Sequence, residues 1–254
     1  MLTALMRRFL YFPNREDLTV LKGLAAKVGL EPWMDRRSRL LGWRRPSGLK
    51  GRPARCLLVF HGNAGFALDR TYFVEGFESL GKGWDVYLFE YPGYGARSGS
   101  PSEKAIKNAA QEATRELLSS NRQVYLLGES LGSAVAAHIA SVPGRQASGI
   151  VLVTPFTSLA DVARRNYPFL PVDLIMSERY DSVSALKSYG GPAAFIIAEL
   201  DEIVSAESGL KLFEGYNGPK RLWLQKGKYH NTLAYRPSEK WWKEVAGFIT
   251  SPFP

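Results

Sequence analysis

The residues from 124 to 137 read, in order, as a short apolar run, a sharp turn that carries a serine, and an alanine-rich helix. Four consecutive apolar residues suit a parallel strand that is covered on both faces. Gly128 and Gly132 flank Ser130 with the spacing Gly-x-Ser-x-Gly. At a tight strand-to-helix turn, side chains at these glycine positions would collide with neighbouring elements, and the serine hydroxyl is pushed out of the sheet. Ser130 is therefore a candidate nucleophile, and the alternative is a tight turn with a purely structural role.

Apolar runs and helical patterns alternate along most of the chain. Helices are expected near residues 67–80, from the N-cap Ser102 to about Ser119, and at the end of the chain around Trp241 and Phe248. This alternation predicts an α/β fold with a mostly parallel central sheet and helices on both faces. The runs that read as buried strands lie at residues 56–60, 84–90, 124–127, 150–153, 195–198 and 222–224.

The beginning of the chain has a different pattern. Asn14 is the expected N-cap of a helix that runs to about Val28, and Gly29 follows it as a typical C′ residue. Residues 36–45, in which apolar and basic residues mix, read as the first edge strand. The chain is thus predicted to contain a basic N-terminal helical segment, residues 1–39, and a single α/β domain, residues 40–254.

One connection is too long for a compact α/β domain. Residues 154–181 contain apolar residues throughout and separate two predicted strands. We interpret them as a small helical cap inserted at about residues 155–185, above the strand ends. The alternative is an ordinary pair of crossover helices.

A serine hydroxyl needs a base to take its proton, and the chain contains three histidines. His61 ends a strand in a glycine-rich turn, where we expect it to shape the backbone. His138 lies eight residues after Ser130 on the following helix, about two turns away, so it cannot reach back to the hydroxyl. His230 follows the last predicted strand on a loop. The sequence therefore favours His230 as the general base.

A carboxylate is expected to orient this histidine and to stabilise its charged form. Asp201 directly follows the strand at residues 195–198 and lies between the serine and the histidine in the chain. This is the order that G-x-S-x-G enzymes with this kind of sheet use. Glu202 and Glu199 are rivals, because a shift of one or two residues at the strand end would change which side chain points inward.

Backbone N–H groups are expected to stabilise a negatively charged oxygen during acyl transfer. The amide of Leu131, the first residue of its helix, is one candidate for this oxyanion hole. The second should come from the turn at residues 61–65, with Asn63 as the first choice and Ala64 as the alternative.

Several motifs together resemble the α/β-hydrolase family, and within it the bud-emergence-type serine hydrolases, whose relatives include protein depalmitoylases. The resemblance covers about residues 40–250. It implies a triad of Ser130, His230 and Asp201, with Asn63 and Leu131 as oxyanion-hole donors. The motifs are His-Gly-Asn-Ala-Gly (61–65), Tyr-Pro-Gly-Tyr-Gly-Ala-Arg-Ser-Gly-Ser-Pro-Ser-Glu (91–103), Gly-Glu-Ser-Leu-Gly-Ser (128–133), Thr-Pro-Phe-Thr-Ser-Leu (154–159), Asp-Glu-Ile-Val (201–204) and Tyr-His-Asn (229–231).

The net charge of +9 is concentrated at the beginning of the chain. Residues 1–55 contain 13 Lys or Arg and 4 Asp or Glu, whereas the other residues contain 20 of each. A general affinity of the fold for nucleic acid is therefore not expected. The single Cys56 excludes an internal disulfide, and the N-terminus lacks a secretory signal, so we predict a cytoplasmic location. With one Cys and three dispersed His, we predict no metal and no cofactor.

An amphipathic pattern within residues 1–12 suggests a peripheral contact with membrane. Arg7 and Arg8 lie opposite its apolar face, and such a segment can hold a protein at an anionic bilayer surface without spanning it. Relatives often carry a full membrane anchor here. The alternative is that the segment packs on the protein's own body or pairs two subunits, so the oligomeric state stays open. The apolar face consists of Leu2, Leu5, Met6, Phe9, Leu10 and Phe12.

Three functions are consistent with these residues. The first is a serine hydrolase that cleaves a small-molecule or lipid-like carboxylic ester or thioester through an acyl-enzyme. The second is an amide or peptide hydrolase with the same triad, because both bonds pass through the same kind of tetrahedral intermediate. The third is a non-catalytic lipid- or protein-binding module on a hydrolase fold, which is disfavoured because all three triad positions are filled.

Overall fold

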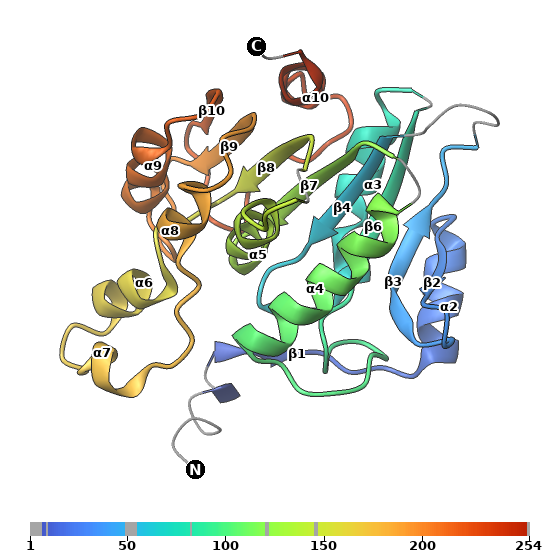
Figure 1. Ribbon diagram of the computed structural model, residues 1–254, viewed down its shortest axis with the longest axis horizontal. Helices are drawn as coiled ribbons and strands as arrows, with labels where there is room; N and C mark the ends of the chain where they lie inside the picture. The colour runs from blue at the N-terminus through green and yellow to red at the C-terminus, as the bar shows by residue number, and fades with distance from the viewer. Residues whose placement is uncertain are drawn as a thin grey trace.

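The structure is a computed structural model that describes residues 7–8, 10–48, 55–81, 83–119, 122–144 and 147–252. Within these residues an eight-stranded sheet has the order β10-β9-β8-β7-β4-β6-β3-β2 (Figure 1). The strands from β10 to β6 are parallel, and β3 and β2 add antiparallel at one edge. The strands are β2 (Glu31–Met34), β3 (Leu40–Arg45), β4 (Arg55–Phe60), β6 (Trp84–Phe89), β7 (Val124–Glu129), β8 (Gly149–Val153), β9 (Ala193–Ala198) and β10 (Lys220–Gln225).

Helices cover both faces of the sheet, as the apolar strands require. In β4, Leu58 and Phe60 face one core with α4, α5, α8 and α9, while Leu57 and Val59 face the other with α2, α3 and α10. This alternation follows from the two-residue period of a strand. The helices are α2 (Leu18–Lys27), α3 (Thr71–Glu78), preceded by the short 3₁₀ helix η1 (Ala67–Arg70), α4 (Glu103–Leu118), α5 (Leu131–Ala140), α6 (Leu159–Asn166), α7 (Val172–Ile175), α8 (Ser182–Leu186), α9 (Ala206–Gly215) and α10 (Trp241–Thr250).

The predicted α/β fold and its parallel strands are confirmed, as is Ser102 as the N-cap of α4. The predicted N-cap Asn14 is wrong. Asp17 caps α2, since its side chain accepts a hydrogen bond from the amide of Thr19. Asn14 instead continues an extended segment that includes β1 (Phe12–Pro13), which pairs in parallel with β5 (Ala64–Gly65). The helical pattern predicted through Phe12 is therefore also wrong at that residue.

The first edge strand begins later than predicted. Residues 35–39 form a turn in which the Asp35 carboxylate accepts hydrogen bonds from the amides of Arg37 and Arg39, each at 2.8 Å. The strand β3 starts only at Leu40, and β2, which was not predicted, pairs with it at the outer edge. A proline in β2 is tolerated because an edge strand has one side without partners. The proposed boundary between residues 39 and 40 thus falls between two paired strands.

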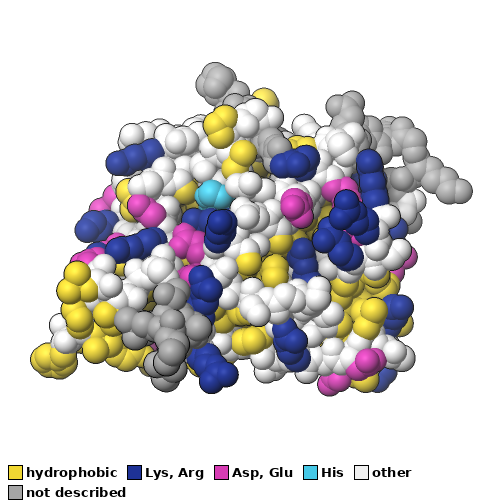
Figure 2. Space-filling view, turned by 60° about the horizontal axis from the view of Figure 1, so that its bottom comes forward, with side chains coloured by type: hydrophobic (Ala, Val, Ile, Leu, Met, Phe, Trp, Pro, Cys, Tyr) yellow, Lys and Arg dark blue, Asp and Glu magenta, His cyan; other side chains and the backbone are white. Residues whose placement is uncertain are grey.

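The long connection after β8 contains three short helices. Within it, α6 and α7 pack on each other around Ala160, Val172 and Met176, whereas Leu186 of α8 joins the core on the α5 face. In Figure 1, α6 and α7 project beyond the carboxyl ends of the parallel strands. Figure 2 shows apolar side chains gathered at one corner of the molecule. The exposed apolar residues of the α6–α7 segment are Tyr167, Phe169, Leu170 and Leu174.

The predicted amphipathic segment lies largely outside the described residues, which omit 1–6 and Phe9. Of its apolar face, Leu10 packs against the core, and Phe12 is 53% exposed. Throughout the described part of the chain, every helix is too short or too polar to cross a membrane.

Candidate active site

Ser130 lies between β7 and α5 in a conformation that few residues adopt, with φ 52° and ψ −117°. Its amide donates to the carbonyl of Val153 at 2.9 Å, so the turn is tied to β8. A Cβ at Gly128 would overlap the carbonyl of Gly132, and a Cβ at Gly132 would overlap the carbonyl of Phe60. Both glycines are therefore needed for α5 to pass this close to β4 and β7.

Replacing Gly132 with Ala is expected to lower the free energy of unfolding by about 3 kcal/mol or more, because the new methyl group forces backbone apart. Urea denaturation measures this change. Gly247→Ala in α10 is a matched control, since a Cβ there meets no atom within 4 Å and Ala is favoured over Gly in a helix. Equal midpoints for wild type and Gly132→Ala would contradict the close packing described above.

The structure brings the three predicted triad residues together at the carboxyl ends of the parallel strands. His230 Nε2 lies 3.1 Å from Ser130 Oγ, and His230 Nδ1 lies 2.8 Å from Asp201 Oδ2. The other carboxylate oxygen of Asp201 accepts from the amides of Ile203 and Val204, each at 3.0 Å. One oxygen is thus fixed by the backbone, and the other is left for the imidazole.

Several opposing effects set the charge state of Asp201. Burial alone would raise the pKa of its carboxyl group, but the hydrogen bond and charge of His230, together with the amides of Val204 and Ile203, hold the pKa below its usual value. The carboxylate therefore remains ionised next to the imidazole. Of its two rivals, Glu199 accepts from the amide of Gly227, and Glu202 lies 3.5 Å from the amide of His230 rather than at its ring.

The predicted oxyanion-hole donors lie beside Ser130. Leu131 is the first residue of α5, where an amide has no partner within the helix. The main-chain amide of Asn63 donates to no acceptor among the described residues, whereas the main-chain carbonyl of Asn63 accepts from the amide of Phe12 and from the hydroxyl of Tyr94. Ala64, the alternative donor, belongs to β5. Asn63 and Leu131 both line the cavity that contains Ser130 and His230.

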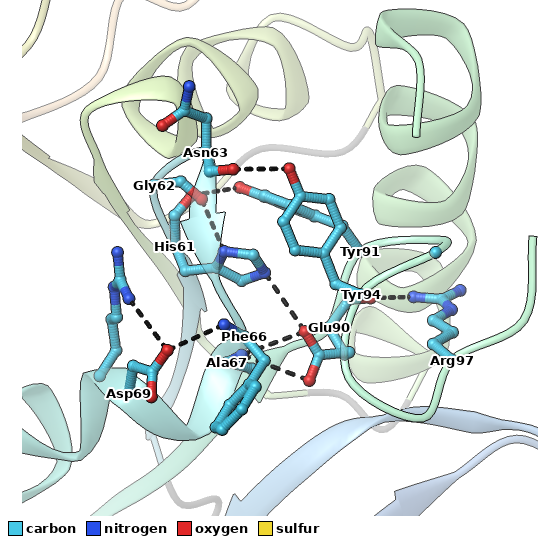
Figure 3. Close-up of polar contacts among 12 residues, drawn as sticks. His61, Gly62, Asn63, Phe66, Ala67, Asp69, Glu90, Tyr91, Tyr94 and Arg97 are labelled. Carbon is cyan, nitrogen blue, oxygen red and sulfur yellow. Dashed lines mark hydrogen bonds and ion pairs between the residues drawn. The ribbon is translucent and has the colours of Figure 1, made fainter. Parts of the chain in front are cut away.

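The imidazole of His61 is directed toward Glu90 and toward its own loop, residues 61–65, rather than toward Ser130. Its Nδ1 is 2.7 Å from the carbonyl of Gly62, and its Nε2 is 3.4 Å from a carboxylate oxygen of the fully buried Glu90. Figure 3 shows this pair together with Tyr91 and Tyr94, whose hydroxyls donate to carbonyls of the loop. The predicted role of His61 in shaping the backbone agrees with these contacts.

His138 lies on α5 with its Nε2 3.0 Å from Gln111 Nε2, away from Ser130. Burial, assisted by the charge of Lys107, lowers the pKa of His138 from 6.5 to about 4. Between about pH 6.5 and pH 4, His138 is therefore protonated in the unfolded chain but neutral in the folded chain.

The free energy of unfolding is expected to fall as the pH drops from about 6.5 to 4, because the unfolded chain then gains a proton on His138 that the folded chain does not bind. His138→Gln, which cannot titrate, should show a weaker fall in urea denaturation at pH 7 and pH 4.5; identical pH dependence in both proteins would contradict this origin.

The cavity wall contains a group of hydrogen-bonded polar side chains that the sequence does not predict. There the carboxylate of Glu129, next to the candidate nucleophile, accepts from Arg70 Nε at 2.8 Å and from the hydroxyl of Tyr72 at 2.5 Å. Burial would raise the pKa of Glu129, but the charge of Arg70, the hydrogen bonds from Tyr72 and Arg70 and the charge of His230 together lower that pKa. The partners are 57 and 59 residues away in the chain, so no local sequence pattern reveals the pair.

The cavity has a volume of about 510 Å³, and its wall contains two chemically different groups of side chains. Arg70, Glu129 and Tyr235 are joined by hydrogen bonds and form the polar side. The apolar side is formed by Phe156 and by Leu10, Leu159 and Val162, which pack against the same core cluster. Among the described residues, no group of three or more His, Cys, Asp or Glu side chains is arranged to hold a metal ion. The site offers a hydroxyl, an imidazole and a carboxylate in hydrogen-bond contact, in a cavity that Asn63 and Leu131 also line.

Comparisons with known proteins identify the fold and the relatives of this chain. A family model described as "alpha/beta hydrolase fold" matches residues 56–173. The uncharacterised protein Rv2307c of Mycobacterium tuberculosis is 36% identical over 235 residues, which cover 89% of this chain and 80% of that protein. Protein bem46 of Schizosaccharomyces pombe is 30% identical, with 62% of this chain and 54% of that protein covered.

Two further matches have names that describe an activity. The lysophosphatidylserine lipase ABHD12 of Danio rerio is 26% identical, with 89% of this chain and 64% of that protein covered. The solved structure of the Pyrococcus furiosus esterase Pf2001 has a TM-score of 0.68 at 18% identity, with 94% of this chain and 98% of that chain covered. At that identity the second match bears on the fold alone. The chain belongs to the α/β-hydrolase family and is related to its Bem46 and ABHD12 branch.

Proposed function

We propose that this protein is a cofactor-independent serine hydrolase that cleaves a carboxylic ester or thioester through an acyl-enzyme. The observation that carries the proposal is the position of His230, whose two ring nitrogens lie within hydrogen-bond distance of Ser130 Oγ and Asp201 Oδ2. A hydroxyl, a base and an orienting carboxylate in this order constitute the minimal apparatus for acyl transfer.

In this mechanism Ser130 Oγ attacks the substrate carbonyl while His230 Nε2 takes the hydroxyl proton. Asp201 accepts from Nδ1, which keeps Nε2 free as the acceptor and stabilises the imidazolium. In the same mechanism the main-chain amides of Asn63 and Leu131 donate to the developing oxyanion. His230 then gives its proton to the leaving alcohol or thiol, and a water molecule, activated by the same base, releases the acyl group from Ser130.

The two sides of the cavity support an amphiphilic substrate. An acyl chain fits against Leu10, Phe156 and Val162, whereas a polar alcohol portion fits toward Arg70 and Glu129. The name of the ABHD12 relative, a lysophosphatidylserine lipase, is consistent with a lipid-like ester. A cytoplasmic location remains part of this proposal. A peripheral contact of residues 1–12 with an anionic membrane also remains part of it and is supported by the basic N-terminal segment, whereas the packing of Leu10 and Tyr11 supports the alternative that the segment packs on the protein's own body.

Two measurements test the proposal. A fluorophosphonate probe should label the protein, and peptide mapping should place the adduct on Ser130. In parallel, p-nitrophenyl esters of increasing acyl length should be hydrolysed in preference to aminoacyl anilides. Faster cleavage of the anilides would favour an amide hydrolase with the same triad. A folded protein that neither reacts with the probe nor hydrolyses either series would support the non-catalytic binding module instead.

A further inference from the structure

The loop that carries the proposed oxyanion donor Asn63 is bonded to the beginning of the chain. The Phe12 amide donates to the carbonyl of Asn63 at 3.0 Å, and the Asn14 amide donates to the carbonyl of Gly65 at 3.0 Å. The side-chain amide of Asn63 donates in return to the carbonyl of Leu10 at 2.8 Å. We refer to residues 10–14, which make these bonds, as the N-terminal strap.

The strap is anchored on its other side to the segment between α7 and α8. The hydroxyl of Tyr11 lies 2.6 Å from a carboxylate oxygen of Glu178 and 2.9 Å from the hydroxyl of Tyr180. Arg7 Nε donates to the other oxygen of Glu178 at 2.8 Å, and the amide of Glu103 donates to this carboxylate as well. Because Tyr11, Glu178 and Tyr180 are all buried, breaking one of these hydrogen bonds leaves a polar atom without a partner, and water cannot replace the lost bond.

The strap also forms part of the cavity wall, since Leu10 and Tyr11 line the cavity that holds Ser130 and His230. It therefore touches the oxyanion loop, the substrate cavity and the α7–α8 segment at once. A segment that only covered the core would not need the hydrogen bond between the Asn63 side chain and the Leu10 carbonyl.

Both carbonyls around the proposed donor amide are held by hydrogen bonds. In a trans peptide the C=O and the N–H point in opposite directions, so holding the carbonyl of Gly62 through His61 Nδ1 also aims the Asn63 N–H. The next carbonyl, that of Asn63, is held by Phe12 from the strap and by Tyr94 from the opposite side, as Figure 3 shows for Tyr94. His61 thus holds the carbonyl that precedes the Asn63 amide, and the strap holds the carbonyls of Asn63 and Gly65 that follow it.

We infer that the N-terminal strap is a positioning element of the active site: its bonds to Asn63 and its Tyr11 anchor hold the oxyanion-hole amide in register with Ser130. This inference rests on the proposed hydrolase function. Loss of a strap bond should therefore lower kcat, which depends on the transition state, while KM changes little.

Two point variants of the full chain test the inference. Asn63→Ala keeps the backbone donor but removes the side-chain bond to Leu10, and Tyr11→Phe removes only the hydroxyl anchor. We expect Asn63→Ala to lower kcat about 10-fold to 100-fold with KM within about twofold, a fraction of the loss seen when an oxyanion donor is removed outright. For Tyr11→Phe, the expected loss is smaller, about threefold to tenfold. Binding of a trifluoromethyl ketone, which forms an oxyanion on the serine, should weaken by the same factor as kcat/KM.

Tyr189→Phe is the matched control, because the hydroxyl of the buried Tyr189 also donates to a main-chain carbonyl, that of Pro192, at 3.2 Å, but Tyr189 does not line the cavity. It should retain wild-type kcat. Hydrogen–deuterium exchange of the 61–67 peptide supplies a readout that needs no activity, and exchange should be faster in both strap variants than in the control.

If both strap variants keep wild-type kcat, ketone affinity and exchange, the strap is only a covering segment and the inference is overturned. A uniform fall in all three variants would also overturn it, because it would indicate general destabilisation. A wild type that hydrolyses no ester and reacts with no probe would refute the proposed function, and the exchange measurement would still show whether the strap holds the loop.

Discussion

Replacing Ser130 with Ala is expected to lower kcat for an activated ester by about five to six orders of magnitude, because among the described residues Ser130 alone brings a hydroxyl within hydrogen-bond distance of the His230 ring. The fold should survive, since the turn is held by the Ser130 amide and carbonyl, which alanine retains. The alanine must keep the unusual backbone angles of this position, so a small loss of stability is expected with it. Initial rates with a p-nitrophenyl ester measure the effect on kcat.

The control for this variant is Ser119→Ala. Ser119 lies at the C-terminal end of α4, where its hydroxyl donates only to the carbonyl of Glu116, and it precedes β7 at the end opposite Ser130. It should keep wild-type rates. Substantial hydrolysis by a folded Ser130→Ala protein, with matching fluorophosphonate labelling, would show that the nucleophile lies elsewhere.

The second large effect is expected from Asp201→Asn, with a fall in kcat of about 10⁴-fold and an intact fold. The backbone amides of Ile203 and Val204 require an acceptor, so the Asn oxygen should take the place of Oδ1. Its NH₂ group then faces His230 Nδ1, which becomes an acceptor, and the ring proton moves to Nε2. In that tautomer the imidazole cannot take the proton of Ser130.

The two rival carboxylates provide matched controls for the same change of chemistry. Glu202→Gln and Glu199→Gln also replace a carboxylate with an amide within two residues of position 201, but their hydrogen bonds go to main-chain amides. Each should lose less than about 10-fold in kcat. If one of them instead shows the large loss while Asp201→Asn retains activity, the identification of the orienting acid is wrong.

The sequence predicts best what local patterns encode. Buried strands appear as apolar runs, and the two glycines around Ser130 mark the turn because their side-chain positions are occupied by Gly132 and Phe60 backbone. His230 follows from elimination, since each of the other two histidines lies on an element that points elsewhere. These inferences use neighbours in the chain, or constraints that any α/β sheet imposes.

The missed features depend on partners that are distant in sequence. Asn14 has the chemistry of an N-cap, yet the carbonyl of Gly65 takes its amide into an extended segment, and Asp17 caps the helix instead. Likewise, the bond between Glu129 and Arg70 and the bond between Tyr11 and Glu178 join residues 59 and 167 positions apart. Neither has a periodicity or a motif, so only the packed fold reveals them.

The strand order has a consequence for synthesis on the ribosome. The central strand β4 pairs with β6, made soon afterwards, and with β7, made much later, while His230 comes only after β10. The strap can form its hydrogen bond with Asn63 early in translation, whereas Glu178, the partner of Tyr11, is synthesised only when most of the chain has been translated. Long-range pairings of this kind form slowly, and their apolar strands stay exposed in the meantime. A nascent chain that ends before residue 230 therefore carries the serine and its loop but no base, so hydrolytic capacity should arise only as the last strand joins the sheet.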